Sequence, residues 1–468
     1  MTYVPVRAVE VHAWGSLVGA VALDPATGFY AFEYSPEWRA SGRELAPLHM
    51  PTTARRPVFE FPRLDPGTYH RLPALLADSL PDALGNALVT HWMRTNGVLD
   101  KDITPLDRLA YAGARAIGAL EFVPPASVDA PVASAVELSD LVSAARATVA
   151  GRLDEVGSTD ALLQLINVGS SPGGARAKAL VAFDPETEEI RAGHGRAPEG
   201  FSQWLLKLDG TGARSMDGRV DTLGESAPYG RIEFAYALMA QAAGVRMTEC
   251  RMLERDGRAH FMTRRFDRAD DGARVHVSSL CAIDHLDFRR AGEFSYDQYL
   301  DVAARLGVPD EEVEQGFRRM VFNVIAVNRD DHTKNLAFIL PRDGAWGLAP
   351  AFDVTHAYNS VGEWTQRHQM LVNGRSDNLS LADLVAVGER HKVPGVRTVV
   401  REVLRAVDHW EEFARTAGVP ASDVARMRAD MRDMEPAGVR SVLREGRVRR
   451  PLASEGPAPG GEETDEDN

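Results

Sequence analysis

Short apolar runs with polar residues between them dominate the start of the chain. They cover residues 9–11, 17–23 and 29–34, and turn-forming stretches that contain Gly15 and Gly28 separate them. Alternation with a period of two places every second side chain on one face of an extended strand. The pattern therefore predicts an antiparallel β-meander.

Residues 72–93 carry apolar side chains three and four residues apart, which is helical spacing, and Pro81 interrupts them. Proline has no N–H to donate, and its ring clashes with the preceding turn of a helix. We therefore expect two helical pieces that meet near Pro81. A Pro/Ala/Ser-rich stretch over 124–134 indicates a linker, and an amphipathic helix is expected over 136–149.

The pattern changes twice in the rest of the chain. A mixed block follows the linker, with strands expected over 178–183, 203–208, 250–253 and 259–263 and a helix over 231–243. After residue 296, helices dominate, and they are expected over 299–306, 313–327, near Leu381, over 396–416 and over 422–434, with one strand pair at 335–340 and 346–349. Residues 454–468 contain six acidic and no basic residues and are expected to be disordered.

These elements predict an α+β fold in four segments. A β-rich N-terminal subdomain would cover 1–125, a nucleotide-binding lobe 126–265, a mainly helical lobe 266–450 and a disordered acidic tail 451–468. The length of 468 residues suits about three domains of typical size, and a hydrophobic content of 44% allows a large core.

Composition narrows the class of protein. The 53 basic and 67 acidic residues give a net charge of −14, which argues against a non-specific nucleic-acid binder. Cys250 and Cys281 are too few for a disulfide framework. No stretch approaches the roughly 18 to 20 apolar residues of a membrane helix. We expect a cytoplasmic protein without a membrane partner.

The densest polar segment, Asn-Arg-Asp-Asp-His-Thr-Lys-Asn at residues 328–335, lies between apolar runs. Asp330 and Asn335 reproduce the D-x-x-x-x-N spacing of a kinase catalytic loop, in which the Asp accepts the substrate hydroxyl proton and the Asn holds magnesium. Asp353 follows where a second metal-binding carboxylate is needed. The pattern predicts ATP-dependent phosphoryl transfer, with Asp330 as base and with Asn335 and Asp353 as Mg²⁺ ligands.

Other residues of this loop leave alternatives open. Asp331 is a rival for the base, but it lies four rather than five residues before Asn335. We expect His332 to support the loop beside the ATP site. Lys334 contacts either the γ-phosphate or nothing. A solvated helix-to-strand loop without catalytic residues is the alternative interpretation.

Two upstream features are suited to hold the phosphates of ATP. Lys207 lies inside an apolar strand pattern, where a buried ammonium group requires an anion. Its acidic partner is Glu225 or Glu233, of which Glu233 is better placed. Residues 169–178 form a Gly/Ser-rich loop whose backbone N–H groups suit phosphate oxygens, although a plain turn is the alternative and neither common glycine-rich nucleotide motif matches.

The order of these features closely resembles the HipA family, the serine/threonine kinase toxins of bacterial type II toxin–antitoxin systems. The resemblance rests on a Ser-x-x-Gly-Ala-x-x-Lys loop at 171–178, on Lys207, on Arg-Phe-Asp-Arg at 265–268, on the loop 330–335 and on Pro-Ala-Phe-Asp at 350–353. Residues 77–82 are similar to part of the family's N-terminal subdomain, so the resemblance spans about 6–450. It implies a two-lobed protein-kinase-like fold with ATP in the cleft.

The resemblance also implies roles for individual residues. The strand end at 263–266 would form the adenine-facing hinge, with Arg264 and Phe266, and Asp267 would lie at the ribose. The phosphates would meet Ser171, Gly173, Gly174, Ala175 and Lys178 of the glycine-rich loop. The family autophosphorylates a loop serine, here Ser171 with Ser170 as the alternative. A phosphate there adds about −1.5 to −2 charge where the ATP phosphates belong and so inactivates the kinase.

The partners follow from the resemblance as well. The family's toxins are held inactive on operator DNA by a small helix-turn-helix antitoxin of the HipB type. They phosphorylate a Ser or Thr of a cellular protein, in some members an aminoacyl-tRNA synthetase, and so inhibit growth. Two other functions are considered, namely a small-molecule kinase of the aminoglycoside or choline type and an inert kinase-fold module that acts as a transcriptional co-repressor. The N-terminal subdomain argues against the first, and the retained charged residues argue against the second.

Overall fold

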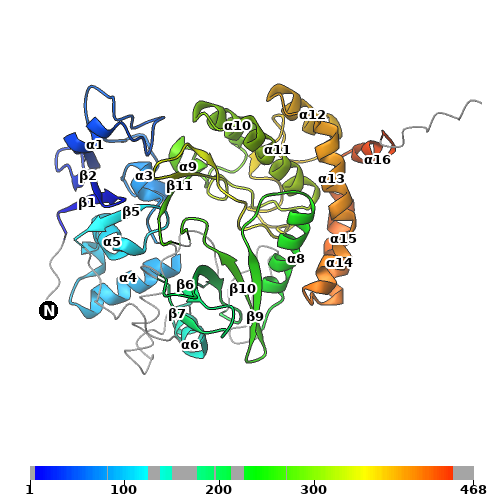
Figure 1. Cartoon of the computed structure of the whole chain (residues 1–468), viewed down its shortest axis with the longest axis horizontal. Coiled ribbons are helices and arrows are strands. Elements are labelled where there is room, and N and C mark those ends of the chain that lie inside the picture. Colours follow the sequence, from blue (N-terminus) through cyan, green and yellow to red (C-terminus); the bar gives the residue numbers. More distant parts are fainter. Residues whose placement is uncertain are drawn as a thin grey trace, which may run out of the picture.

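The alternating runs at the start of the chain form a five-stranded sheet in the order β4-β3-β2-β1-β5. The strands are β1 (Ala8–Ala13), β2 (Ser16–Leu23), β3 (Tyr30–Tyr34), β4 (Val58–Phe59) and β5 (Leu120–Val123). The first three are the predicted meander, and burial alternates along β1 and β3 but only in part along β2. The computed structural model describes residues 6–81, 83–124, 138–149, 177–193, 197–211, 226–269 and 271–445 (Figure 1).

Five helices complete this N-terminal subdomain, namely α1 (Pro36–Ser41), α2 (Pro66–Tyr69), α3 (Ala74–Ala77), α4 (Ala83–Thr95) and α5 (Pro105–Ala112). The predicted break near Pro81 is confirmed, because α3 ends before it and α4 begins after it. The predicted linker and the acidic tail lie outside the described residues, apart from Pro124.

A second antiparallel sheet has the order β7-β6-β8-β10-β9. It consists of β6 (Lys178–Phe183), β7 (Ile190–Ala192), β8 (Ser202–Lys207), β9 (Cys250–Arg255) and β10 (Arg258–Arg264), and it is accompanied by α6 (Leu138–Val149) and α8 (Tyr229–Ala242). All of these elements except β7 were predicted from the sequence. Lys178 on β6 lies opposite Lys207 on β8 in the register, so two lysines meet at one end of the sheet.

The C-terminal half is mainly helical, as predicted. It contains α9 (Leu280–Ile283), α10 (Tyr296–Arg305), α11 (Asp310–Ile325), α12 (Leu381–Arg390), α13 (Val396–Asp408), α14 (Trp410–Thr416), α15 (Ala421–Asp433) and α16 (Val442–Glu445). A three-stranded sheet consists of β11 (Val275–Ser279), β13 (Ala337–Pro341) and β14 (Gly347–Leu348). A two-stranded sheet pairs β12 (Phe294–Ser295) with β15 (Met370–Leu371).

The single helix predicted over 396–416 is wrong, because the chain breaks at His409 between α13 and α14. Arg428 of α15 donates to the carbonyl oxygens of Val407 (3.1 Å) and Asp408 (2.8 Å). These contacts satisfy carbonyl groups at the end of α13, where no intrahelical partner is present.

One hydrophobic core runs from the N-terminal subdomain into the helical half, and a second core lies between the β6–β10 sheet and helices α4 and α6. In Figure 1 the N-terminal subdomain lies on one side, the helices α12–α15 lie on the other, and the β6–β10 sheet lies between and below them. The N-terminal subdomain is therefore packed firmly against the rest of the described chain.

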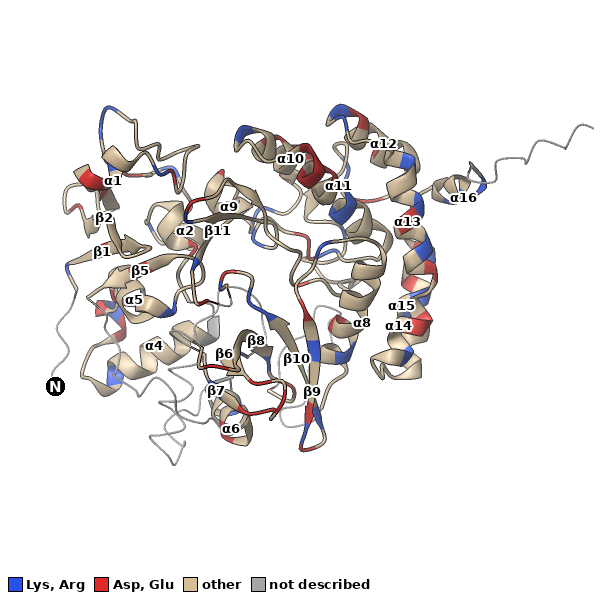
Figure 2. Ribbon diagram, viewed as in Figure 1, with Lys and Arg blue, Asp and Glu red and all other residues tan. Residues whose placement is uncertain are grey.

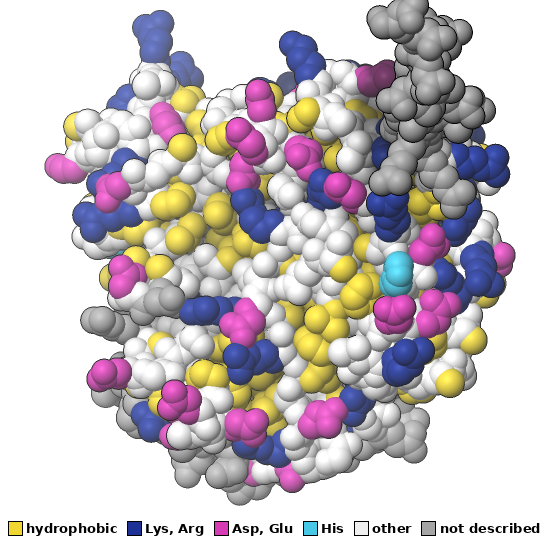
Figure 3. Space-filling model, turned by 45° about the vertical axis from the view of Figure 1, so that its right-hand side comes forward, with side chains coloured by type: hydrophobic (Ala, Val, Ile, Leu, Met, Phe, Trp, Pro, Cys, Tyr) yellow, Lys and Arg dark blue, Asp and Glu magenta, His cyan; other side chains and the backbone are white. Residues whose placement is uncertain are grey.

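Charged residues of both signs lie side by side along α13, α14 and α15 (Figure 2). Examples are the ion pairs of Arg428 with Glu411 (3.0 Å) and of Arg440 with Asp408 (3.0 Å). The face in Figure 3 likewise mixes both signs with exposed hydrophobic side chains. Among the residues that the structure describes, no helix combines the length and the apolar character needed to cross a membrane.

Candidate active site

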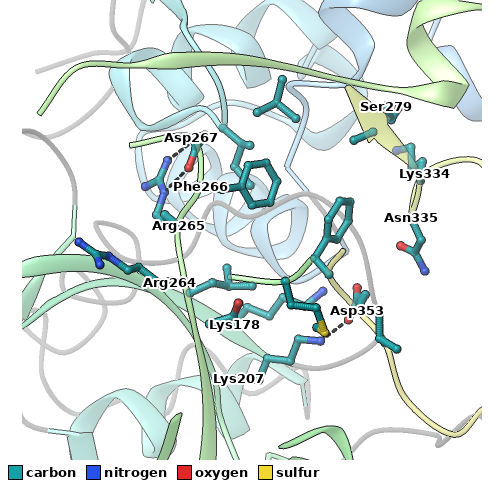
Figure 4. Close-up of a pocket in the computed structure, with 18 of the residues that line it drawn as sticks. Lys178, Lys207, Arg264, Arg265, Phe266, Asp267, Ser279, Lys334, Asn335 and Asp353 are labelled. Atoms are coloured by element: carbon teal, nitrogen blue, oxygen red, sulfur yellow. Dashed lines mark hydrogen bonds and ion pairs between the residues drawn. The ribbon is translucent and has the colours of Figure 1, made fainter. Parts of the chain in front are cut away.

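A pocket of about 1190 Å³, including its open mouth, lies where the three parts of the chain meet. The β6–β10 sheet and α8 contribute Lys178, Lys207, Glu233 and Arg264. The helical half contributes Lys334, Asn335 and Asp353, and the N-terminal subdomain contributes Asp78, Ser79 and Ile117. Figure 4 shows Lys178 and Lys207 pointing from the sheet toward Asp353 on the opposite side.

Lys207 is the centre of a buried ion cluster. Its Nζ lies 2.6 Å from Glu233 Oε1 on α8 and also donates to Asp353 Oδ1. Burial by itself would lower the pKa of Lys207, but the carboxylates of Asp353 and Glu233 outweigh burial and raise that pKa. The structure thus gives Lys207 an acidic partner in Glu233, whereas Glu225 lies outside the described residues.

Asp353 is held in an unusual conformation between the two lobes. Its φ of 54° is costly for a residue other than glycine, by about 1–3 kcal/mol. The preceding Phe352 packs against Phe266, with ring centroids 5.8 Å apart. Burial tends to raise the pKa of Asp353, yet Lys207 and Lys178 lower it well below its usual range, which keeps the carboxylate charged.

Asp330 follows the buried end of α11. Its Oδ1 accepts a hydrogen bond from Trp364 Nε1 (2.8 Å), and its backbone oxygen accepts one from Asn335 Nδ2 (2.8 Å). Burial raises the pKa of Asp330, while His332 and the bond from Trp364 oppose that rise. Asn335 therefore fixes the backbone of the loop, and its amide oxygen remains to serve as a ligand.

The neighbouring Asp331 has a structural environment. It is 1% exposed and accepts hydrogen bonds from Tyr296 Oη (2.8 Å), His368 Nδ1 (2.9 Å) and the backbone N–H of Gln369 (2.8 Å). A carboxylate with these partners cannot approach a substrate hydroxyl. Of the two candidate bases, the geometry favours Asp330.

We expect Asp331→Asn to lower the free energy of unfolding by about 1–3 kcal/mol, because the amide cannot accept from all three donors and leaves buried groups unsatisfied. Urea denaturation measures this loss. Asp343→Asn is the matched control, since the side chain of Asp343 is 79% exposed. Unchanged stability in Asp331→Asn would contradict the structural role.

The remaining predicted residues of this loop have different surroundings. Lys334 lines the pocket, and its Nζ lies 4.9 Å from the ring centroid of Phe288. His332 does not line the pocket, and its ring contacts Phe288 and Trp364 while its Nε2 lies 3.8 Å from Asp330 Oδ1. His332 therefore supports the loop, and a contact of its side chain with ATP does not fit this arrangement.

The predicted hinge residues Arg264, Phe266 and Asp267 all line the pocket. The Asp267 carboxylate also accepts hydrogen bonds from Arg265 Nε (2.9 Å), Arg268 Nη1 (2.8 Å) and the N–H of Gly118 (2.8 Å). Burial would raise the pKa of Asp267, but the two arginines lower it well below its usual range. These bonds join the hinge to the N-terminal subdomain, and because Asp267 also lines the pocket, its place at the ribose stays a prediction.

Gly118 shows how close this junction is. Its φ is +82°, and a Cβ atom there would lie 2.9 Å from the backbone nitrogen of Val277 on β11. A side chain would therefore be both strained and too close, so glycine is the residue that this contact requires.

Residues 169–176 of the predicted glycine-rich loop lie outside the described residues, and they include Ser170, Ser171, Gly173, Gly174 and Ala175. Two parts of the site were missed by the sequence interpretation. Trp364 is 34 residues from Asp330 and has no motif around it, and Asp78 was noted only as part of a subdomain signature. Both join the site through tertiary contacts alone.

The chemistry of the donor set fits Mg²⁺ together with a nucleoside triphosphate. Asp353 and Asn335 offer carboxylate and amide oxygens at the pocket, and Mg²⁺ is commonly held by one or two carboxylates plus substrate phosphates. Within the described residues, no three His, Cys, Asp or Glu side chains converge on one point. Lys178 and Lys207 place positive charge on the opposite wall of the pocket.

Comparisons with known proteins show the family of this chain. The model for the HipA N-terminal domain matches residues 9–123, and the model for the HipA-like C-terminal domain matches residues 170–437. Y4dM of Sinorhizobium fredii, which is named as a supposed kinase, is 28% identical over 202 residues. That match covers 38% of this chain and 47% of Y4dM, so the chain matches about half the length of this curated relative.

Solved structures show the fold. HipA of Shewanella oneidensis MR-1, solved with HipB and its operator DNA, superposes with a TM-score of 0.62 at 15% identity and covers 93% of this chain and 97% of that chain. The proinflammatory kinase CtkA of Helicobacter pylori reaches a TM-score of only 0.31 at 9% identity, covering 54% of this chain and 94% of CtkA, and supports no argument. The predicted two-lobed α+β fold with a β-rich N-terminal subdomain is confirmed by the likeness to HipA. With both domain models matched in order along its length, this chain belongs to the HipA family.

Proposed function

We propose that this chain is an ATP-dependent serine/threonine protein kinase that acts as the toxin of a toxin–antitoxin system. The observation that carries the proposal is the cluster of Lys207, Glu233 and Asp353 in one pocket, next to the loop of Asp330 and Asn335. A lysine–glutamate pair together with a metal-binding Asp is the arrangement that a kinase requires before transfer occurs.

Each group has a part in the proposed reaction. Lys207 and Lys178 neutralise charge on the phosphates, and Glu233 holds Lys207 in place. Asp330 accepts the proton of the acceptor hydroxyl as the oxygen attacks the γ-phosphorus and the bond to ADP breaks. When bound by Asn335 and Asp353, Mg²⁺ would supply electrostatic stabilisation of the charge on the transferred group.

The partners belong to the same proposal. The likeness to a HipA that was solved with HipB and operator DNA supports a HipB-type antitoxin here, with operator DNA met only through that complex. The acceptor would be a cellular protein, for which an aminoacyl-tRNA synthetase is a candidate. Autophosphorylation of Ser171, or of Ser170, would inactivate the kinase by placing charge where the phosphates of ATP belong.

The intact mass of the purified protein, with and without ATP and magnesium, tests this function. We expect one added phosphate that maps to Ser171 or Ser170 and is missing in Asp330→Ala. A bacterial lysate and a panel of aminoglycosides and sugars serve as alternative acceptors, which separates a protein kinase from a small-molecule kinase. Failure to bind ATP and to transfer phosphate would instead support the inert co-repressor.

A further inference from the structure

Three consecutive residues of the catalytic loop are bonded to one later segment, residues 364–369, here called the clamp segment. Arg329 Nη1 donates to the carbonyl oxygen of Gln366, and Trp364 Nε1 donates to Asp330 Oδ1 at 2.8 Å. Asp331 accepts from His368 and from the N–H of Gln369. The loop and the clamp segment are therefore fixed relative to each other, residue by residue.

The clamp segment is itself held in place. The N–H of Gly292 donates to the carbonyl oxygen of Gln369 at 2.8 Å, and the following strand β15 pairs in parallel with β12. The Gln369 side chain donates to the carbonyl oxygen of Trp364. The indole of Trp364 contacts Phe288 and His332, with ring centroids 6.5 Å and 6.2 Å away. These contacts orient the indole N–H toward Asp330.

The hydrogen bond leaves the two oxygens of Asp330 in different surroundings. Oδ1 accepts from Trp364, whereas Oδ2 accepts no hydrogen bond from the described residues. The Cβ–Cγ torsion of aspartate is broad, so an unrestrained carboxylate would sample many orientations. The bond to Trp364 removes this freedom.

We infer that Trp364 is a positioning residue, whose indole N–H holds Oδ1 of Asp330 so that Oδ2 faces the hydroxyl of the acceptor. This inference rests on the proposed function and deepens it. Trp364 itself transfers no proton. Its effect is on the geometry of attack, and a misplacement of about 1 Å can cost roughly 100-fold in rate.

A pair of variants separates the N–H group from the bulk of the ring. Trp364→Phe keeps an aromatic ring and loses the donor, whereas Trp364→His loses the larger ring and keeps a donor, because Nε2 of histidine can occupy the position of the indole nitrogen. Trp14→Phe is the matched control. It also removes a half-buried indole bond, from Trp14 Nε1 to the carbonyl oxygen of Arg274 (2.8 Å), and neither of these residues lines the pocket.

The measurement is the initial rate of ³²P transfer from γ-labelled ATP to the chain itself and to lysate proteins, over a range of ATP concentrations. We expect Trp364→Phe to lower kcat about 10- to 100-fold with KM for ATP unchanged, Trp364→His to recover most of that loss, and Trp14→Phe to match the wild type. Thermal unfolding curves verify that each variant is folded.

Several outcomes would overturn the inference while the wild type remains active. These are full activity in Trp364→Phe, a raised rate in that variant, equal losses in the Phe and His variants, or a loss expressed only in KM for ATP. A wild type that binds ATP but transfers no phosphate would instead refute the proposed function, and this inference with it.

Discussion

Asp330→Asn is expected to slow phosphoryl transfer by about 10²- to 10⁴-fold, which is the usual contribution of a general base. Asparagine has the same shape and still accepts the hydrogen bond from Trp364, but it cannot accept the proton of the acceptor hydroxyl. The folded structure and ATP binding should persist, because the side chain of Asp330 is not part of the ion cluster around Lys207. Transfer of label from γ-³²P-ATP and calorimetric titration with ATP and magnesium measure the two properties separately.

The control for this variant is Asp343→Asn, in the exposed turn between β13 and β14. It makes the same chemical change away from the catalytic loop and the pocket, so its rate should equal that of the wild type. Undiminished transfer in Asp330→Asn would show that another group is the base. A loss of folding would show instead that Asp330 is structural, as Asp331 is.

Lys207→Met should cause the largest combined loss of stability and ATP binding, because it removes the cation between two buried carboxylates. The side chains of Lys207 and Glu233 are 9% and 6% exposed, so the charges left behind cannot be well hydrated. Breaking a buried pair in this way typically costs about 3–5 kcal/mol of unfolding free energy. ATP binding should also fall, because the phosphates lose a counter-charge.

The loss of stability in Lys207→Met is expected to depend on pH and to be larger at neutral pH than in acid. In the wild type the lowered pKa of Asp353 contributes stability above the unfolded pKa of about 4, and this contribution is lost as the pH falls. In Lys207→Met the unpaired carboxylates take up protons more readily. Protonation removes their buried charge, so the destabilisation of the variant becomes smaller in acid. The difference in stability between variant and wild type should therefore shrink as the pH falls from 7 toward about 4.

A double variant separates stability from binding. Lys207→Met combined with Glu233→Gln removes one of the unpaired charges, so it should recover part of the lost stability and none of the ATP binding. Lys101→Met, at an exposed position, is the control for removing a lysine. Wild-type ATP affinity in Lys207→Met would contradict the role of Lys207 at the phosphates.

The local pattern of the chain predicted most of its elements. The run from Lys178 to Phe183 is apolar enough to define β6 by itself, and Pro81 placed the break between α3 and α4. Periodicity failed at His409, because the apolar spacing continues through it. The carbonyl groups of Val407 and Asp408 accept hydrogen bonds there from Arg428 of another helix, which no local pattern reveals. The short β7 was missed because three residues contain too little pattern to recognise.

At the candidate site, the spacing of Asp330, Asn335 and Asp353 could be recognised from the chain's pattern alone. The same pattern identified Lys207 as a buried lysine that requires an anion. Spacing along one loop is a local property, so it could be recognised without a structure. The tertiary structure decided which groups meet. In the folded chain Lys207 pairs with Glu233, and Trp364 donates a hydrogen bond to Asp330. Asp331 is enclosed by Tyr296, His368 and Gln369. Asp267 accepts hydrogen bonds from two arginines. Those contacts join residues far apart in the sequence, and only the packing of the lobes brings them within hydrogen-bond distance.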